Sequence, residues 1–131
     1  MRKVAPRLVL LLAVPLAACG GAVGHDFETD FKAAKANAAT LKGGAFDHAV
    51  GQRLLTPDTA AAVQQCAARH APERETYRGV MAFDGSRGYR LRFEADDDFA
   101  DCLAGVLEGR EMPEPPERPY LMPVELAGKA K

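Results

Sequence analysis

Three cysteines and one histidine are the residues of this chain best suited to specific chemistry. Cys19 ends an apolar run near the N-terminus, whereas Cys66 and Cys102 lie in the body of the chain. A thiol can be acylated, oxidised to a disulfide or bound to a metal. Cys66 and His70 are four residues apart and would share a helix face, and Cys102 would complete three ligands of an open zinc site. Metal or redox chemistry at Cys66, His70 and Cys102 is therefore one interpretation, and a disulfide is the other.

Residues 1–18 have the layout of an export signal. Arg2, Lys3 and Arg7 form a positive head, and the first acidic residue is Asp26. The unbroken apolar run, residues 8–16, is nine residues long, whereas a membrane-spanning helix needs about 20. Two alanines follow, and small side chains suit a signal peptidase. We therefore expect cleavage near the first cysteine rather than a lasting transmembrane anchor.

The sequence Leu16-Ala17-Ala18-Cys19 resembles the lipobox of bacterial lipoproteins. The resemblance implies that Cys19 is the lipidation site, carries diacylglycerol and a fatty acid such as palmitate, and becomes the first residue of the mature protein. Gly20 in the next position implies sorting to the outer membrane, facing the periplasm. Two or more acyl chains would hold the chain firmly to membrane lipid. An ordinary secretory signal with a chance cysteine is the alternative.

The rest of the chain has the size of one domain. Without residues 1–18, 113 of the 131 residues remain. The leader contains three of the 17 basic residues and none of the 18 acidic ones, so the remainder has a net charge of −4. No basic excess therefore favours nucleic acid. If Cys19 is acylated, Cys66 and Cys102 are the remaining pair, and we predict that they form a disulfide in an oxidising compartment.

Hydrophobic periodicity predicts an α+β fold, with N-terminal helices followed by a small antiparallel sheet packed on two helices. Apolar residues recur at helical spacing up to Gly43-Gly44, which we expect to stop the first helix, and Thr56-Pro57 should begin another. Asp96-Asp97-Asp98 should cap a later helix rather than bind calcium. The predicted helices cover residues 27–41, 45–54, 57–71 and 99–107, and the predicted strands cover residues 77–84, 89–95 and 120–126.

Glycine and proline residues define the predicted connections of the sheet. Gly85 and Gly88 supply the positive φ angles of a hairpin turn between the first two strands. Residues 112–119, MPEPPERP, should form an extended spacer that brings the last strand back. Pro123 lacks a donor, so this strand should lie at an edge or contain a bulge. We expect residues 127–131 to be a disordered tail.

Three arginines, Arg78, Arg90 and Arg92, should project from the sheet face opposite Tyr89, Leu91 and Phe93. This row could serve as an interaction face for phosphate groups or an acidic partner. The alternative is the solvated face of a half-buried sheet.

The order of elements from residue 56 to 126 resembles the TonB/TolA C-terminal fold, in particular its cysteine-containing AgmX/PglI class. Residues 79–85, GVMAFDG, resemble the family's first strand and turn, residues 99–107 its next helix, and residues 113–116 its proline stretch. The family's Tyr-Pro opening, any tryptophan and a proline-rich stalk are missing, so the resemblance implies only the shape. Together with the predicted leader and lipidation site, this resemblance gives five segments: a leader (1–18), a lipidated tether (19–25), a helical segment (26–55), the TonB/TolA-like domain (56–126) and a tail (127–131).

Two functions fit this sequence. The first is a lipid-anchored binding or structural module of the cell envelope. This module would have no catalytic activity, cofactor or small-molecule substrate. It would contact another envelope protein through a sheet edge or the arginine row. The second is a membrane-anchored periplasmic enzyme or a metal- or redox-binding protein that uses Cys66, His70 and Cys102. The sequence lacks a CxxC pair, a nucleophile elbow, a zinc-protease helix and a phosphate loop, which favours the first function.

Overall fold

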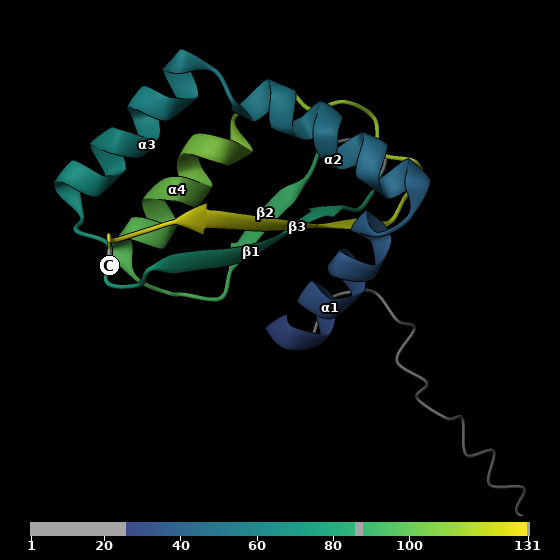
Figure 1. Ribbon diagram of the computed structural model, residues 1–131, viewed down its shortest axis with the longest axis horizontal. Helices are drawn as coiled ribbons and strands as arrows, with labels where there is room; N and C mark the ends of the chain where they lie inside the picture. Colours follow the sequence, from purple (N-terminus) through teal and green to yellow (C-terminus); the bar gives the residue numbers. More distant parts are fainter. Residues whose placement is uncertain (1–25, 86–87, 131) are drawn as a thin grey trace, which may run out of the picture.

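A computed structural model describes residues 26–85 and 88–130, and its secondary structure confirms the α+β class (Figure 1). The leader, Cys19 and the tether lie outside these residues. Among the described helices, none has the length and apolar character required to cross a bilayer. The described elements are α1 (Phe27–Ala38), α2 (Leu41–Leu54), α3 (Pro57–Arg69), β1 (Thr76–Phe83), β2 (Arg90–Phe93), α4 (Asp98–Glu108) and β3 (Tyr120–Ala127).

The three described strands form one antiparallel sheet in the order β2-β1-β3. Met81 in the central strand lies opposite Leu91 of β2 and Met122 of β3. The hairpin prediction is confirmed, because Gly85 and Gly88 both have positive φ, 69° and 77°. Glycine adopts positive φ without the steric cost that a side chain would add.

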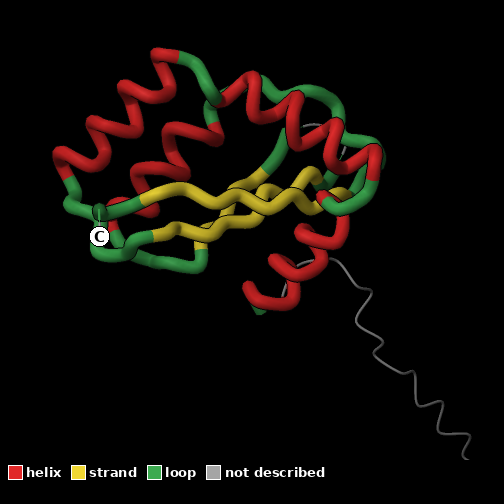
Figure 2. Tube along the Cα trace, in the orientation of Figure 1, coloured by secondary structure: helices red, strands yellow, loops and turns green. Residues whose placement is uncertain are grey.

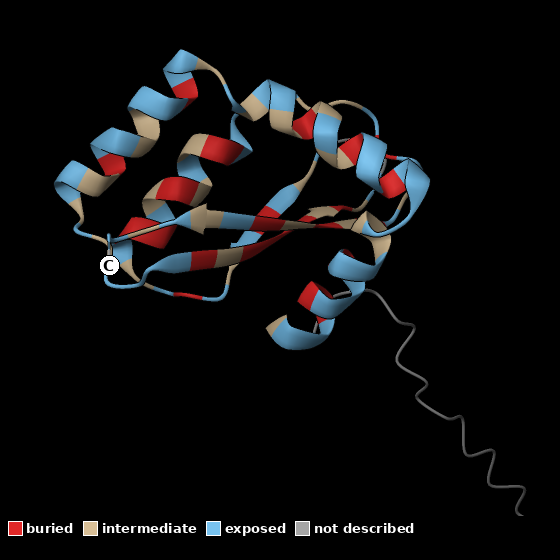
Figure 3. Cartoon of the chain, in the orientation of Figure 1, coloured by how far each residue is buried: buried red, intermediate tan, exposed pale blue. Residues whose placement is uncertain are grey.

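Helices cover both faces of the sheet. Figures 1 and 2 show α2, α3 and α4 on one side and α1 alone on the other. Phe46 and Val50 of α2 enter the main core with Met81 and Phe83 of β1. On the opposite face, α1 forms a smaller cluster, in which Phe31 and Ala34 contact Val80 of β1. Each of the described helices and strands contains buried residues, which are drawn red in Figure 3.

The prediction that Gly43-Gly44 ends a helix is wrong. The first helix ends at Ala38, and both glycines lie in the first turn of α2. Thr40 is the N-cap of α2, and its hydroxyl accepts a hydrogen bond from the Gly43 N–H at 3.0 Å. A threonine that satisfies a free N–H group begins a helix more strongly than the following glycines end one. Leu41, the last residue of the first predicted helix, is instead the first residue of α2 and is 88% exposed.

The other helix boundaries follow their caps. Thr56 and Pro57 begin α3 as predicted, and the Asp97 side chain accepts from the Ala100 N–H at 2.8 Å to begin α4. A side-chain oxygen in the N-cap position satisfies an N–H group that has no partner within the helix.

The C-terminal strand is an edge strand, which confirms the prediction from Pro123. The prediction of a disordered tail from residue 127 is wrong for its first three residues. Ala127 ends β3, and the N–H groups of Gly128 and Lys129 donate to the carbonyls of Glu75 and Arg74. These two hydrogen bonds continue the antiparallel pairing of β1 and β3 beyond the ends of both strands. The backbone of residues 128 and 129 is therefore ordered by hydrogen bonds.

Candidate functional site

The two cysteines of the domain form a disulfide between α3 and α4. Their Cα atoms are 5.7 Å apart, and Cys66 is 1% exposed. Cys66 shares a core cluster with Phe99 and Leu103 of α4 and with Tyr77 of β1. The predicted pairing is therefore confirmed. Since α3 packs mainly against α4, this bond reinforces that contact with a covalent cross-link.

His70 does not join the cysteines in a metal site. It is the C-cap residue of α3, and its N–H donates to the Cys66 carbonyl at 2.9 Å. Its side chain lines a shallow pocket with Glu73, Asp97 and Asp98. Among residues 26–85 and 88–130, no group of three or more His, Cys, Asp or Glu side chains is placed to hold a metal. Both thiols are consumed by the disulfide and cannot ligate a metal while it is intact.

Tyr77 connects the start of β1 to both neighbouring segments. Its hydroxyl donates to Asp97 at 2.8 Å and accepts from the Glu73 N–H at 3.0 Å. Burial and the hydrogen bond to Asp97 raise the pKa of this phenol. The N-cap of α4, the loop after α3 and the sheet therefore share one buried oxygen atom, which fixes the base of the disulfide-linked helix pair.

Arg78, the first residue of the predicted arginine row, is largely enclosed by α1. Its guanidinium lies 4.8 Å from the Phe31 ring centroid and pairs with Glu28 at 2.9 Å and with Glu94. The hydrogen bonds to Glu94 and Glu28 raise its pKa, so the side chain stays charged. A cation held against an aromatic ring and two carboxylates fastens α1 to the sheet.

Arg90 and Arg92 remain more accessible. Their side chains are 65% and 49% exposed, compared with 30% for Arg78. Arg90 pairs with Asp84 across the turn, and Arg92 pairs with the buried Asp30 of α1 at 2.9 Å. The sequence therefore identified the face that these arginines share. It did not reveal that α1 covers part of this face, because Phe27 and Phe31 looked like residues of an ordinary core stripe.

The outer edge of β3 is poorly suited to the addition of another strand. The Arg78 carbonyl accepts a hydrogen bond from the Glu94 N–H, so the backbone groups of Arg78 point toward β2. Because backbone groups alternate in direction along a strand, those of Val80 also point toward β2. Pro123 lies opposite Val80, and its nitrogen therefore faces outward, where it offers no donor. In addition, the Asn37 side chain donates to the outward carbonyl of Leu121 at 2.9 Å.

The other edge, β2, is also occupied by a side chain. The Leu91 N–H donates to Glu108 of α4 at 3.0 Å. Because β2 has four residues, this bond uses one of the few outward backbone groups that it offers. Short edges with occupied backbone groups resist pairing with another chain. The geometry therefore disfavours the addition of a strand from another chain at either edge of the sheet.

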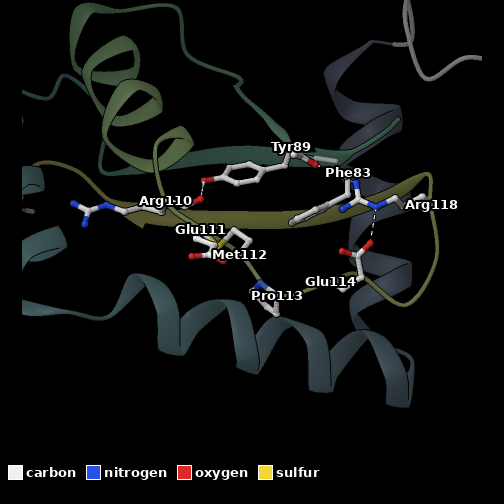
Figure 4. Close-up of a pocket in the computed structure, with 9 residues that line it drawn as sticks. Phe83, Tyr89, Arg110, Glu111, Met112, Pro113, Glu114 and Arg118 are labelled. Carbon is white, nitrogen blue, oxygen red and sulfur yellow. Dashed lines mark hydrogen bonds and ion pairs between the residues drawn. The ribbon is translucent and has the colours of Figure 1, made fainter. Parts of the chain in front are cut away.

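A pocket of about 340 Å³ lies between the hairpin and the proline segment (Figure 4). Its polar groups are largely bound to each other. Arg118 donates to Glu114 at 2.8 Å and to the Gly88 carbonyl at 3.1 Å, and the hydrogen bond lowers the pKa of Glu114. The Tyr89 hydroxyl donates a hydrogen bond to the Arg110 carbonyl at 2.6 Å, and burial raises the pKa of Tyr89. Figure 4 places the Arg110 and Arg118 side chains at opposite ends, so they do not form one anion site.

Two buried oxygen atoms have no hydrogen-bond partner within the described residues: Asp47 Oδ1 and the Tyr120 hydroxyl. Burial raises the pKa of Asp47, and the charge of Lys35 opposes this change. Burial, followed by the charge of Asp47, raises the pKa of Tyr120. A buried oxygen without a hydrogen-bond partner costs free energy, so these two groups destabilise the packing between α2 and the start of β3.

An apolar groove of about 580 Å³ lies between the first half of α3, α4 and the end of β3. Leu55 stands at its rim and is 87% exposed. The sequence analysis did not identify this groove, although Leu55 precedes the N-cap, a position where an apolar residue usually packs on the residue five further along. That residue is Ala60, and its methyl group is too small to cover a leucine. The groove is lined by Leu54, Leu55, Thr56, Pro57, Thr59, Ala60, Val63, Gln64, Leu107 and Leu126.

No protein-family model, curated protein or solved structure matches this chain. The similarity to the lipobox and to the TonB/TolA C-terminal fold therefore remains an inference from the residues quoted above.

Proposed function

We propose that this protein is a lipid-anchored binding or structural module of the bacterial cell envelope, without catalytic activity. In this proposal, acylated Cys19 holds it in the outer membrane, and the folded domain faces the periplasm. The observation that carries the proposal is the disulfide between Cys66 and Cys102. Disulfides persist in exported proteins and are rare in the reducing cytosol. The bond therefore supports the compartment that the leader predicts by an independent route.

The partner that we infer is another envelope protein with an acidic surface. It would contact the accessible part of the arginine row, Arg90 and Arg92. The exposure of these side chains supports this choice, and the occupied backbone groups of both edge strands argue against strand addition. An acidic partner would compete with Asp84 and Asp30 for the guanidinium groups, so the contact should weaken as ionic strength rises.

The alternative is a membrane-anchored enzyme or a metal- or redox-binding protein that uses Cys66, His70 and Cys102. It requires reduction of the disulfide before either thiol can react or bind a metal.

Replacing Cys19 by serine should release the protein from the membrane. The hydroxyl cannot carry the thioether-linked diacylglycerol, and the bound acyl chains are the inferred anchor. Cells grown with labelled palmitate should yield a labelled wild-type protein in the membrane fraction and an unlabelled Cys19→Ser variant outside it. Cys66→Ser with Cys102→Ser is the matched control, because it removes two thiols but should keep the label. Equal membrane recovery of wild type and Cys19→Ser would refute the anchor.

Charge reversal at the accessible arginines should remove the partner. We expect cross-linking in intact cells to give one dominant adduct with the wild type, and Arg90→Glu with Arg92→Glu to lower its yield at least about tenfold. Lys42→Glu with Arg53→Glu, at two exposed positions of α2, changes the net charge by the same amount and should leave the adduct intact. An adduct that survives reversal of both arginines would show that another surface binds the partner.

A further inference from the structure

The apolar groove differs in chemistry from the other pockets described above. Its walls come from Leu54, Val63, Leu107 and Leu126, with Leu55 at the rim, and its lining contains no charged or aromatic side chain. The Thr56 hydroxyl donates to Thr59 at 3.0 Å and accepts from the Thr59 N–H at 3.2 Å, so this threonine is occupied by the helix cap. The surface offered to a ligand is therefore almost entirely aliphatic.

Such a lining selects a ligand that itself needs few hydrogen bonds. An extended peptide would bury a row of N–H and C=O groups against a lining in which Gln64 is the one side chain outside the helix cap that could pair with them, at a cost for each unpaired group. A free fatty acid would place its carboxylate at a rim that offers no cation among the lining residues. A hydrocarbon chain whose polar end stays outside has neither problem. The volume, about 580 Å³, lies within the range of small-ligand sites.

The length of chain between Cys19 and the domain limits how far the domain can move from such a ligand. Six residues lie between Cys19 and Asp26, the first described position, and the seven steps from Cys19 to Asp26, at about 3.5 Å each, span at most about 25 Å. If Cys19 is acylated, a step that rests on the proposed function, the domain cannot move far from the bilayer. Membrane lipid is then the most concentrated source of hydrocarbon chains within reach of the groove.

The disulfide lies outside the groove. Cys66 joins α4 in the second half of α3, whereas the groove is formed by its first half, from Pro57 to Gln64. A ligand in the groove therefore does not have to displace the disulfide. Figure 1 shows this arrangement, with α3 lying above α4 and connected to α2 by a loop.

We propose that this groove binds one acyl chain of a membrane phospholipid, with the head group outside at the level of Leu55. The bound chain would cover the exposed Leu55 and the aliphatic walls, and each buried methylene would add to the affinity. The protein would thereby hold a lipid in addition to its own anchor.

The test uses the purified, lipidated protein in vesicles of phosphatidylethanolamine and phosphatidylglycerol. The vesicles contain a small fraction of phosphatidylcholine that carries a photoreactive diazirine on one acyl chain. After irradiation, peptide mapping should find the adduct on residues 54–64. Ala60→Phe places a ring in the groove and should lower the adduct about tenfold, the effect of excluding about two methylenes. Ala61→Phe, on an exposed neighbour that does not line the groove, is the matched control and should react like wild type.

A second variant guards against a change of fold. Leu55→Asp alters an exposed side chain and should also lower the adduct, while the thermal unfolding midpoint stays unchanged. Protein that floats with the vesicles but shows no groove adduct, or equal adducts in Ala60→Phe and Ala61→Phe, overturns the lipid site and leaves the anchor intact. A cross-link from the groove to a second copy of the chain would equally overturn it. Protein that does not float overturns the proposed anchor, so flotation and adduct report separately on the two proposals.

Discussion

Replacing both Cys66 and Cys102 by alanine is expected to lower the free energy of unfolding by about 4 kcal/mol. The bond closes a loop with a sequence separation of 36 residues, and the chain-entropy estimate for such a loop is about 4 kcal/mol. A domain of this size has only about 5–15 kcal/mol of stability. The thermal midpoint should therefore fall by about 15 °C, and α3 should lose protection against hydrogen exchange before the sheet does.

Thermal unfolding followed by circular dichroism would measure this effect, with wild type in a strong thiol reductant as the control. Reduced wild type should unfold near the temperature of the double variant, and the double variant should not respond to the reductant. A double variant as stable as oxidised wild type would show that packing between α3 and α4 alone holds the helix pair together.

Adding one methyl group at Gly43 should be nearly as damaging. A Cβ atom there would lie 1.8 Å from the Asn37 carbonyl oxygen and 2.6 Å from the Tyr120 hydroxyl. Backbone cannot yield as a flexible side chain can, so α1 and α2 would have to separate at their junction. We expect Gly43→Ala to cost about 3 kcal/mol, the upper part of the usual range for overpacking.

The adjacent glycine provides the control. At Gly44 a Cβ atom would meet the Ala38 carbonyl at 3.5 Å, an ordinary contact distance. Gly44→Ala should therefore stabilise the protein by about 0.5–1 kcal/mol, through the higher helix propensity of alanine. Urea unfolding midpoints of the two variants should move in opposite directions. A similar response of both would mean that the junction of α1 and α2 is more plastic than its packing indicates.

These two glycines illustrate how far the sequence could predict the fold. Glycine pairs often follow helices, which led to the wrong prediction that residues 43 and 44 end one. The requirement at Gly43 is tertiary, because a side chain does not fit where α2 passes the end of α1 and Tyr120, and Gly44 has no such requirement. By contrast, Thr56-Pro57, Asp97 and the glycines of the hairpin act on their own neighbours. Such local signals can be read from sequence, and all three were predicted correctly.

The candidate site divides in the same way. The disulfide could be predicted because the compartment and the number of thiols limit the choice. The groove could not, because its walls come from α2, α3, α4 and β3, and no periodicity in one segment shows which aliphatic residues remain uncovered. Likewise, the arginines were placed on the correct face, but their partners Glu28 and Asp30 lie about 50 and 60 positions away along the chain.

The contact between Arg78 and α1 also has a mechanical meaning. If Cys19 anchors the chain, as proposed above, α1 is the first of the described elements that a pull on the anchor would reach. Its hold on the sheet consists of a small apolar cluster, stacked rings and charged pairs. Under load, α1 should peel away and lengthen the chain while the cross-linked helices behind the sheet stay folded. Detachment of α1 would then limit the force that reaches the sheet and the disulfide-linked helices.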